Sequence, residues 1–337
     1  MNNDLSSYFE DPEFKEALEK YEGMVKNHTP AYFDADELTD IAEYYASKGR
    51  QIEAEAAIDF ALQLHPNDTD ALIFRARSLA MKGRLDEAYM VMDLIEDRSD
   101  REVRFLKADL LMEEKRMEEA DHVFEELAAY EEGKLETLID IILAYIDANQ
   151  EALAKKWIKH VGETYDLASL SQKNQKFRDL LCDFYITFNN PEAAIPLLQA
   201  TLDCYPYSIN HWNSLGKCYL STNDYEEAHE AIDFALAIDD SNAEALTLKA
   251  FCYQQSGELQ KSCDYYLRLA EQQENKTRAY LALAKTYFEM QDYTSSIYYI
   301  EALLDNKDAL SKYELSELYG DIALCHAALK HIGVGQA

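Results

Sequence analysis

A small residue recurs eight times along this chain of 337 residues at a nearly constant interval. The successive intervals are 34, 32, 34, 40, 34, 34 and 34 residues. The recurring residues are Ala54, Ala88, Ala120, Ala154, Ala194, Ala228, Ser262 and Ser296. A repeat of this length is typical of chains that stack one helix-turn-helix unit on the next. Such a chain grows by adding units, and no unit can bury its apolar face without neighbours.

The stretch from residue 212 to residue 235 carries the fullest version of the repeat. It reads W-x2-L-G-x2-Y followed by spaced small residues, namely Trp212, Leu215, Gly216, Tyr219, Ala228, Ile232 and Ala235. This pattern resembles the tetratricopeptide repeat (TPR), in which a helix A and a helix B lie antiparallel. The resemblance implies that the two helices approach most closely at Gly216 and Ala228. The Gly216 position recurs as Ala42, Ala76, Ala108, Ile142, Cys182, Gly216, Ala250 and Ala284.

One residue in each unit is expected to end helix A and turn the chain into helix B. These residues are Gly49, Gly83, Lys115, Asn149, Asn189, Asn223, Gly257 and Gln291. Glycine and asparagine dominate the set because a residue that ends a helix often needs a positive φ. We therefore predict eight left-handed turns.

The resemblance implies an all-α, right-handed solenoid of about eight TPR-like units with a capping helix at each end. We predict a disordered start and a capping helix over 1–34, units 1–4 over 35–168, an insertion at 169–174, units 5–8 over 175–310, and a C-terminal capping helix and tail over 311–337. The insertion is either a longer loop or a break that divides the array. The apolar face of the last helix is either a cap or a homodimer contact through 311–330.

Acidic residues dominate the surface chemistry. The chain has 64 Asp and Glu against 32 Lys and Arg, and its formal net charge is −32. This charge attracts basic partners and repels nucleic acid and anionic membranes, although it would also simply keep a long solenoid soluble. None of the six cysteines forms a CxxC pair, so we expect reduced, packed thiols. The chain start shows no signal peptide, and no segment approaches about 18 apolar residues, so we expect a cytoplasmic protein.

Motifs for catalysis are missing from the sequence. It contains no GxGxxG, P-loop, HExxH or GxSxG pattern, and its eight histidines are scattered. Abundant acidic pairs are expected to form solvated helix faces. We therefore expect no enzyme activity, no cofactor and no metal.

In the family that this chain resembles, the A helices line a concave groove that binds protein segments. Carried over position by position, the expected groove residues are Asp36, Asp40, Glu43, Phe74, Arg77, Phe105, Asp109, Met112, Asp140, Leu143, Asp147, Asn213, Lys217, Phe251, Arg278 and Lys285. The first eleven form an acidic and apolar zone, and the last five a polar and basic zone. The alternative is that many of the apolar members only fill the seam between neighbouring A helices.

These observations favour a non-catalytic scaffold or adaptor that binds a basic protein or peptide with apolar anchors in the groove. One alternative is an acidic decoy or regulator that occupies a basic nucleic-acid-binding site on its partner. Another is an accessory subunit of a separate enzyme. The sequence does not identify the partner.

Overall fold

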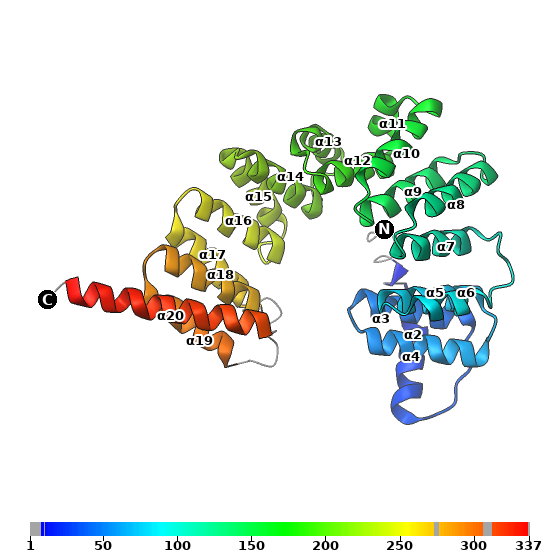
Figure 1. The fold of residues 1–337 in the computed structure, drawn as a ribbon, viewed down its shortest axis with the longest axis horizontal. Coiled ribbons are helices and arrows are strands. Elements are labelled where there is room, and N and C mark those ends of the chain that lie inside the picture. The colour runs from blue at the N-terminus through cyan, green and yellow to red at the C-terminus, as the bar shows by residue number, and fades with distance from the viewer. Residues whose placement is uncertain (1–7, 10, 273–275, 306–311, 336–337) are drawn as a thin grey trace. The chain divides into compact units, whose positions relative to one another are not determined.

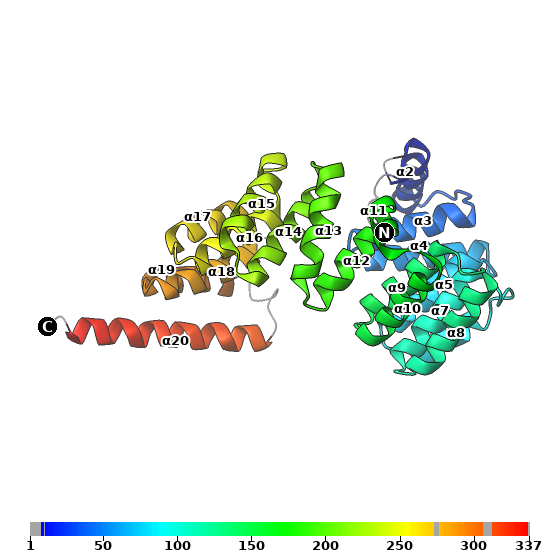
Figure 2. The ribbon, with the colours of Figure 1, turned by 90° about the horizontal axis from the view of Figure 1, so that it is seen from above.

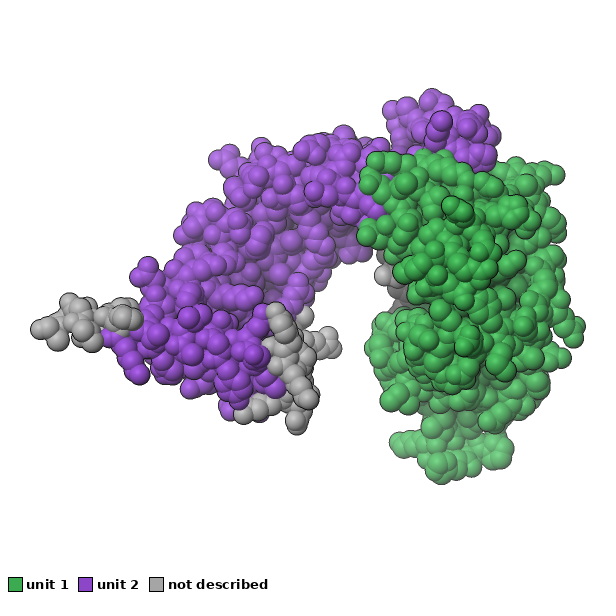
Figure 3. All heavy atoms as spheres, viewed as in Figure 1, with its two compact units in different colours: residues 1–157 green, residues 158–337 purple. Residues whose placement is uncertain are grey.

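A computed structural model describes residues 8–9, 11–272, 276–305 and 312–335. The described residues form nineteen helices and no strand (Figure 1). The chain divides into two compact units, Met1–Trp157 (unit 1) and Ile158–Ala337 (unit 2), which are coloured separately in Figure 3. The boundary falls inside helix α10 (Glu151–Thr164). The disordered start predicted before residue 8 and the residues 306–311 before the last helix lie outside the described residues.

Unit 1 consists of a first helix followed by consecutive helix pairs (Figures 1 and 2). Its helices before α10 are α2 (Pro12–Asn27), α3 (Ala35–Ser47), α4 (Gln51–Leu64), α5 (Thr69–Met81), α6 (Leu85–Met92), α7 (Arg101–Glu113), α8 (Met117–Tyr130) and α9 (Leu135–Asp147). The second pair is short because α6 ends at Met92. Arg98 closes the loop that follows, since its guanidinium donates to the carbonyl oxygens of Ile95 and Asp93.

Unit 2 continues with the same pairing after one additional short helix. Its helices are α11 (Leu167–Lys173), α12 (Gln175–Thr187), α13 (Pro191–Cys204), α14 (Ile209–Thr222), α15 (Tyr225–Ile238), α16 (Ala243–Gln255), α17 (Leu259–Ala270), α18 (Lys276–Glu289), α19 (Tyr293–Leu304) and α20 (Lys312–Gly335). The predicted all-α solenoid of TPR-like helix pairs is thus confirmed. Within the described ranges, no helix combines the length and the apolar character that crossing a membrane requires.

The close contacts predicted between helices A and B are confirmed. All eight small residues from Ala54 to Ser296 are at most 1% exposed, because helix A lies directly against them. At Gly216 the approach is so close that a Cβ atom would lie 2.7 Å from Cγ1 of Ile232. A side chain at this position would therefore push α14 and α15 apart.

The eight predicted left-handed turns are also confirmed. The φ angles of the turn residues lie between 54° and 79°. Two of these residues, Lys115 and Gln291, are neither glycine nor asparagine and still adopt this conformation. Their identity shows that the repeat geometry overrides the local preference of the residue.

A helix caps each end of the described solenoid. At the N-terminal end, the Asp11 carboxylate accepts a hydrogen bond from the amide of Glu13, and Pro12 occupies the first turn of α2. Phe14 and Tyr21 of this helix are buried in one cluster with the first helix pair. At the other end, Leu318 of α20 is buried against α19, so part of the apolar face predicted for a cap or a dimer packs on its own chain.

The segment predicted as an insertion, 169–174, lies within and directly after α11. Arg178 on α12 is only 5% exposed and holds this segment in place. Its guanidinium donates to the carbonyl oxygens of Ser171 and Gln172 at the end of α11 and to the hydroxyl of Thr201 on α13. One buried side chain therefore joins the three helices α11, α12 and α13.

Candidate protein-binding surface

The A helices of unit 1 carry the acidic residues that the sequence analysis assigned to a groove. Asp36, Asp40 and Glu43 stand four and three residues apart on α3, so they follow one stripe of the helix. Acidic residues also lie on α7 and α9, including Asp109, Asp140 and Asp147, whereas the expected groove residues on α5 are Phe74 and Arg77. Stacking these helices as pairs brings these residues together on one face, which we call the inner face of unit 1.

Ion pairs between neighbouring helices show that residues of the inner face meet. The Arg77 guanidinium on α5 lies 3.5 Å from the Glu102 carboxylate and 3.6 Å from the Asp109 carboxylate, both on α7. Arg101 on α7 forms an ion pair with Asp140 on α9. The inner face therefore extends across α5, α7 and α9 without a break.

Carboxylates crowd one another on this face. Burial raises the pKa of Glu43, and the neighbouring Asp40 charge raises it further. Burial also raises the pKa of Asp70, with the charges of Asp68 and Asp36 adding to the effect. The pKa of Asp40 is raised mainly by burial, although a hydrogen bond from Tyr8 opposes the shift. Each shift disfavours the ionised form, although Glu43 and Asp70 keep exposed side chains and are therefore less affected than the half-buried Asp40.

Asp109 is the most perturbed of these acids. Burial raises its pKa to about 6, against the lowering effect of Arg77. Its side chain nevertheless keeps 38% of its surface accessible to water. The carboxylate is thus open to a ligand and poorly solvated without one.

Three of the expected groove residues are buried instead of surface-forming. Phe105 and Met112 are each 7% exposed, and the Phe105 ring packs 5.3 Å from the Phe124 ring on α8. Asn213 is 1% exposed, and its amide donates to the side-chain oxygens of Asn242 and Glu244. These residues join neighbouring helices, so they can position a binding surface but cannot themselves contact a partner.

The other expected residues have accessible side chains. Those on unit 1 that are half-buried are Asp40, Phe74, Asp109, Asp140 and Leu143, and those that are exposed are Asp36, Glu43, Arg77 and Asp147. On unit 2, the exposed members are Lys217, Phe251, Arg278 and Lys285. Lys217 forms an ion pair with Glu244, so its charge is already partnered within the chain.

The structure adds two residues that the sequence analysis missed. Arg101 joins the inner face by pairing with Asp140 and by lying over the Phe105 ring. Tyr8, which precedes α2, donates a 2.5 Å hydrogen bond to Asp40. The repeat period contains no signal for Tyr8 because this residue lies outside every repeat. Arg101 is the first residue of α7. Only the stacking of α7 on α9 shows that its side chain points toward Asp140 on the inner face.

Metal ligands do not gather on this surface. In the part of the chain that the structure describes, no group of three or more His, Cys, Asp or Glu side chains is arranged to hold a metal ion. All six cysteines are free, and five are buried. Burial raises the pKa of the Cys218 and Cys263 thiols to about 11, which disfavours the reactive thiolate.

Comparison with known proteins gives consistent matches to repeat proteins. A tetratricopeptide repeat family profile matches residues 39–89 and 213–277. The chain is 26% identical over 191 residues to the formate-dependent nitrite reductase complex subunit NrfG of Escherichia coli O157:H7. That alignment covers 55% of this chain and 89% of NrfG.

Solved structures of tetratricopeptide repeat proteins are also similar. One from Parabacteroides merdae ATCC 43184 has a TM-score of 0.47 at 16% identity and covers 75% of this chain and 98% of its own. One from Thermus thermophilus has a TM-score of 0.40 at 11% identity, with coverages of 58% and 98%. The repeat signature, the consecutive helix pairs and the matching family profile show that the chain carries tetratricopeptide repeats at residues 39–89 and 213–277.

Proposed function

We propose that this protein is a non-catalytic adaptor whose unit 1 binds a basic protein segment on its inner face. The observation that carries the proposal is the gathering of accessible carboxylates on one face, where ion pairs link α5 to α7 and α7 to α9. The raised pKa values of Asp40 and Asp109 agree with this crowding. Acids that crowd together lower the stability of the free protein, and a cationic ligand relieves that cost. A Lys or Arg side chain is the ligand with this property in a protein partner.

The neighbouring apolar residues supply a second source of affinity. Phe74 and Leu143 are half-buried, so an apolar partner residue could cover what remains exposed. Charge then directs the encounter and sets the register, whereas apolar contact slows dissociation. The expected ligand is an extended or helical segment in which basic and apolar residues alternate.

The comparison with NrfG favours a related role. NrfG is a subunit of a reductase complex by its name, so we propose as a second candidate that this chain is an accessory subunit of a separate enzyme.

The six free cysteines are compatible with the reducing cytoplasm, where we place the protein. A homodimer through 311–330 would use the side of α20 that its own chain leaves open, which includes Leu324 at 58% exposure.

The experiment uses the full chain and short synthetic peptides in which Lys or Arg alternates with Leu or Phe. Binding is measured by fluorescence anisotropy at low and at high salt. The variant Asp109→Lys/Asp140→Lys/Asp147→Lys should weaken binding by roughly tenfold to a hundredfold, because it replaces three attractive charges with repulsive ones.

The matched control changes the same number of charges on the B helices of unit 1. The variant Asp86→Lys/Glu118→Lys/Glu126→Lys alters three exposed acids on α6 and α8. It should change affinity only through net charge, by a few-fold at low salt and very little at high salt. Equal losses for the two variants would show that general acidity, and not the inner face, attracts the peptides.

A further inference from the structure

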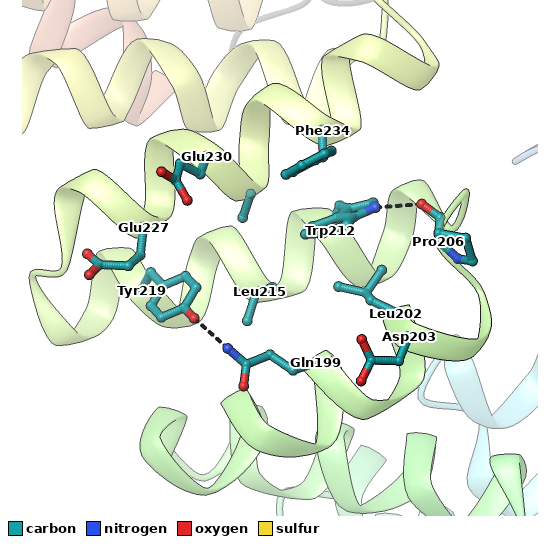
Figure 4. Close-up of a pocket in the computed structure, with 11 residues that line it drawn as sticks. Gln199, Leu202, Asp203, Pro206, Trp212, Leu215, Tyr219, Glu227, Glu230 and Phe234 are labelled. Carbon is teal, nitrogen blue, oxygen red and sulfur yellow. Dashed lines mark hydrogen bonds between the residues drawn. The ribbon is translucent and has the colours of Figure 1, made fainter.

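A hollow of about 490 Å³ lies between α13, α14 and α15 in unit 2 (Figure 4). This volume is in the range of pockets that enclose a small ligand or a long side chain. None of the residues that line it belongs to the groove set that the sequence analysis predicted. Its residues on α14 are those that face the two B helices, so the hollow is a surface separate from the expected groove.

Aromatic rings form one end of the hollow. The Trp212 and Phe234 rings are stacked, with centroids 4.5 Å apart and planes inclined by 17°. The Trp212 indole nitrogen donates a 2.8 Å hydrogen bond to the carbonyl oxygen of Pro206, which fixes the ring. Phe234 is 54% exposed, so a ligand in the hollow can reach its ring. The pair therefore presents a fixed aromatic surface to whatever enters.

Carboxylates also line this hollow. Glu227 and Glu230 come from α15 and Asp203 comes from α13, and Figure 4 shows them on opposite sides of Leu215. The lining contains no lysine, arginine or histidine. Within the described residues, no basic side chain forms an ion pair with any of the three acids. The hollow thus combines a negative rim with an apolar and aromatic interior.

We propose that this hollow binds an arginine side chain of a protein partner. A guanidinium is planar and weakly hydrated, so it stacks on an aromatic face and at the same time donates to carboxylates on either side. Its alkyl stem is apolar and would pack on Leu202 and Leu215. An anion would meet three like charges, and a neutral apolar residue would leave those charges without a partner.

The two tryptophans of the chain allow a direct test. Trp212 lines the hollow, whereas Trp157 is 3% exposed in unit 1, where its indole nitrogen donates to Asp121. Their two indole N–H signals in a ¹H–¹⁵N spectrum are assigned with the variant Trp157→Phe. The probe is a capped synthetic peptide with one arginine between two leucines. It should shift the Trp212 signal saturably and leave the Trp157 signal unchanged.

The same peptide with citrulline in place of arginine is the chemical control, because citrulline keeps the shape and loses the charge. It should bind at least about tenfold more weakly. The lysine peptide should also bind more weakly than the arginine peptide, since an ammonium cannot stack on the rings. Equal responses to the arginine and citrulline peptides would overturn the proposal.

Protein variants give an independent readout. Asp203→Asn/Glu227→Gln/Glu230→Gln should weaken binding by about tenfold or more, whereas Glu226→Gln/Asp240→Asn/Glu271→Gln, which neutralises three exposed acids elsewhere in unit 2, should not. Phe234→Leu keeps an apolar side chain but removes the ring, and should reduce the preference for arginine over lysine. Unchanged affinity in the first variant would refute the site. The inner-face variant of unit 1 should leave the Trp212 response intact, so the two proposals fail separately.

Discussion

Units 1 and 2 are built from the same helix pair, but they leave polar groups unsatisfied in different places. In unit 1 the crowded groups are carboxylates on the inner face. The recurring small residues of its B helices, from Ala54 to Ala154, are all alanine and so bring no polar side chain into the interior. In unit 2 the unsatisfied groups lie in the interior: Asn213 Oδ1, His229 Nδ1 and Ser262 Oγ are, among the described residues, the buried side-chain atoms without a hydrogen-bond partner. A partner can relieve the first kind of cost, whereas only a substitution can relieve the second.

The two kinds of unsatisfied group lower the stability of the folded protein for different reasons. A poorly solvated carboxylate destabilises the free protein. A bound cation removes this destabilisation, and the free energy recovered contributes to the affinity. A buried hydroxyl without a partner costs about 1–3 kcal/mol in every state of the folded protein. We therefore propose binding at the unit 1 carboxylates and propose no ligand for the three interior atoms of unit 2.

The largest expected effect tests whether the interior of unit 2 is tightly packed despite these unsatisfied atoms. Gly216→Ala places a Cβ atom 2.7 Å from the Ile232 side chain. Overpacking costs about 1–3 kcal/mol, against a gain of about 1 kcal/mol from replacing glycine in a helix. We expect a lower melting temperature of unit 2, by a few degrees, measured by circular dichroism.

Gly320→Ala on α20 is the control, because a Cβ atom there meets no other atom within 4 Å. This variant should be neutral or slightly more stable. If Gly216→Ala were as stable as Gly320→Ala, α14 and α15 would be loosely packed, and the close approach of the two helices at Gly216 would not limit stability.

The next effect concerns pH and the inner face of unit 1. The pKa of Asp109 is raised to about 6, so this carboxyl is mostly protonated at pH 5 and mostly ionised at pH 7. A cationic partner favours the ionised form. Affinity for a Lys- and Arg-containing peptide without histidine should therefore rise as pH increases from 5 to 7, on the order of tenfold, in anisotropy titrations at constant salt.

Asp109→Asn should reduce this pH dependence and weaken binding at pH 7. It should also stabilise the free protein at pH 7, because a pKa raised by folding gives stability that is present below the unfolded value, near 4, and is lost as pH rises through 6. The gain should be only about 1 kcal/mol, since the side chain is 38% exposed, and it should vanish at pH 4. Affinity that stays constant or falls from pH 5 to 7 would contradict the proposed role of Asp109.

The smallest expected effect comes from two serines of unit 2, which both occupy the recurring small position of a B helix. Ser262 Oγ has no partner, whereas Ser296 Oγ donates 2.9 Å to the carbonyl oxygen of Ala284. Ser262→Ala should therefore stabilise the protein by up to about 1 kcal/mol, and Ser296→Ala should destabilise it by a similar amount. Urea unfolding would measure both. The same sign for the two variants would mean that burial, and not hydrogen bonding, decides their contribution.

Much of the fold was predictable from the sequence because each unit repeats the same local contacts. The small residues and the left-handed turns recur at a fixed period, so a residue such as Lys115 could be placed in a turn despite its ordinary preference. The capping helices followed from Asp11-Pro12 at one end and from an unpaired helical pattern at the other. A residue pattern that recurs with the repeat period therefore predicts the contacts that every unit makes.

Features made by a single unit were harder to predict. Arg178 holds α11 through carbonyl oxygens, which carry no sequence signal. The repeat position alone assigns Phe105 and Met112 to the groove, and burial by their own neighbours decides that they are not exposed. The hollow of unit 2 is lined by residues from α13, α14 and α15, and its aromatic end is made by Trp212 and Phe234, a pair that no repeat pattern encodes. The sequence analysis identified Trp212 only as part of the repeat signature.

The arginine that joins α11 to its neighbours changes how the irregular stretch would respond to a protease. A six-residue interruption between repeats would ordinarily be a site of cleavage, because proteases need a segment that can be pulled into an extended form. Here the carbonyl oxygens of Ser171 and Gln172 are held by a guanidinium that is itself almost completely buried. This irregular stretch is thus held by one buried side chain. Because α11 has no buried residue of its own, the loss of Arg178 is expected to make the stretch the preferred cleavage site of the chain.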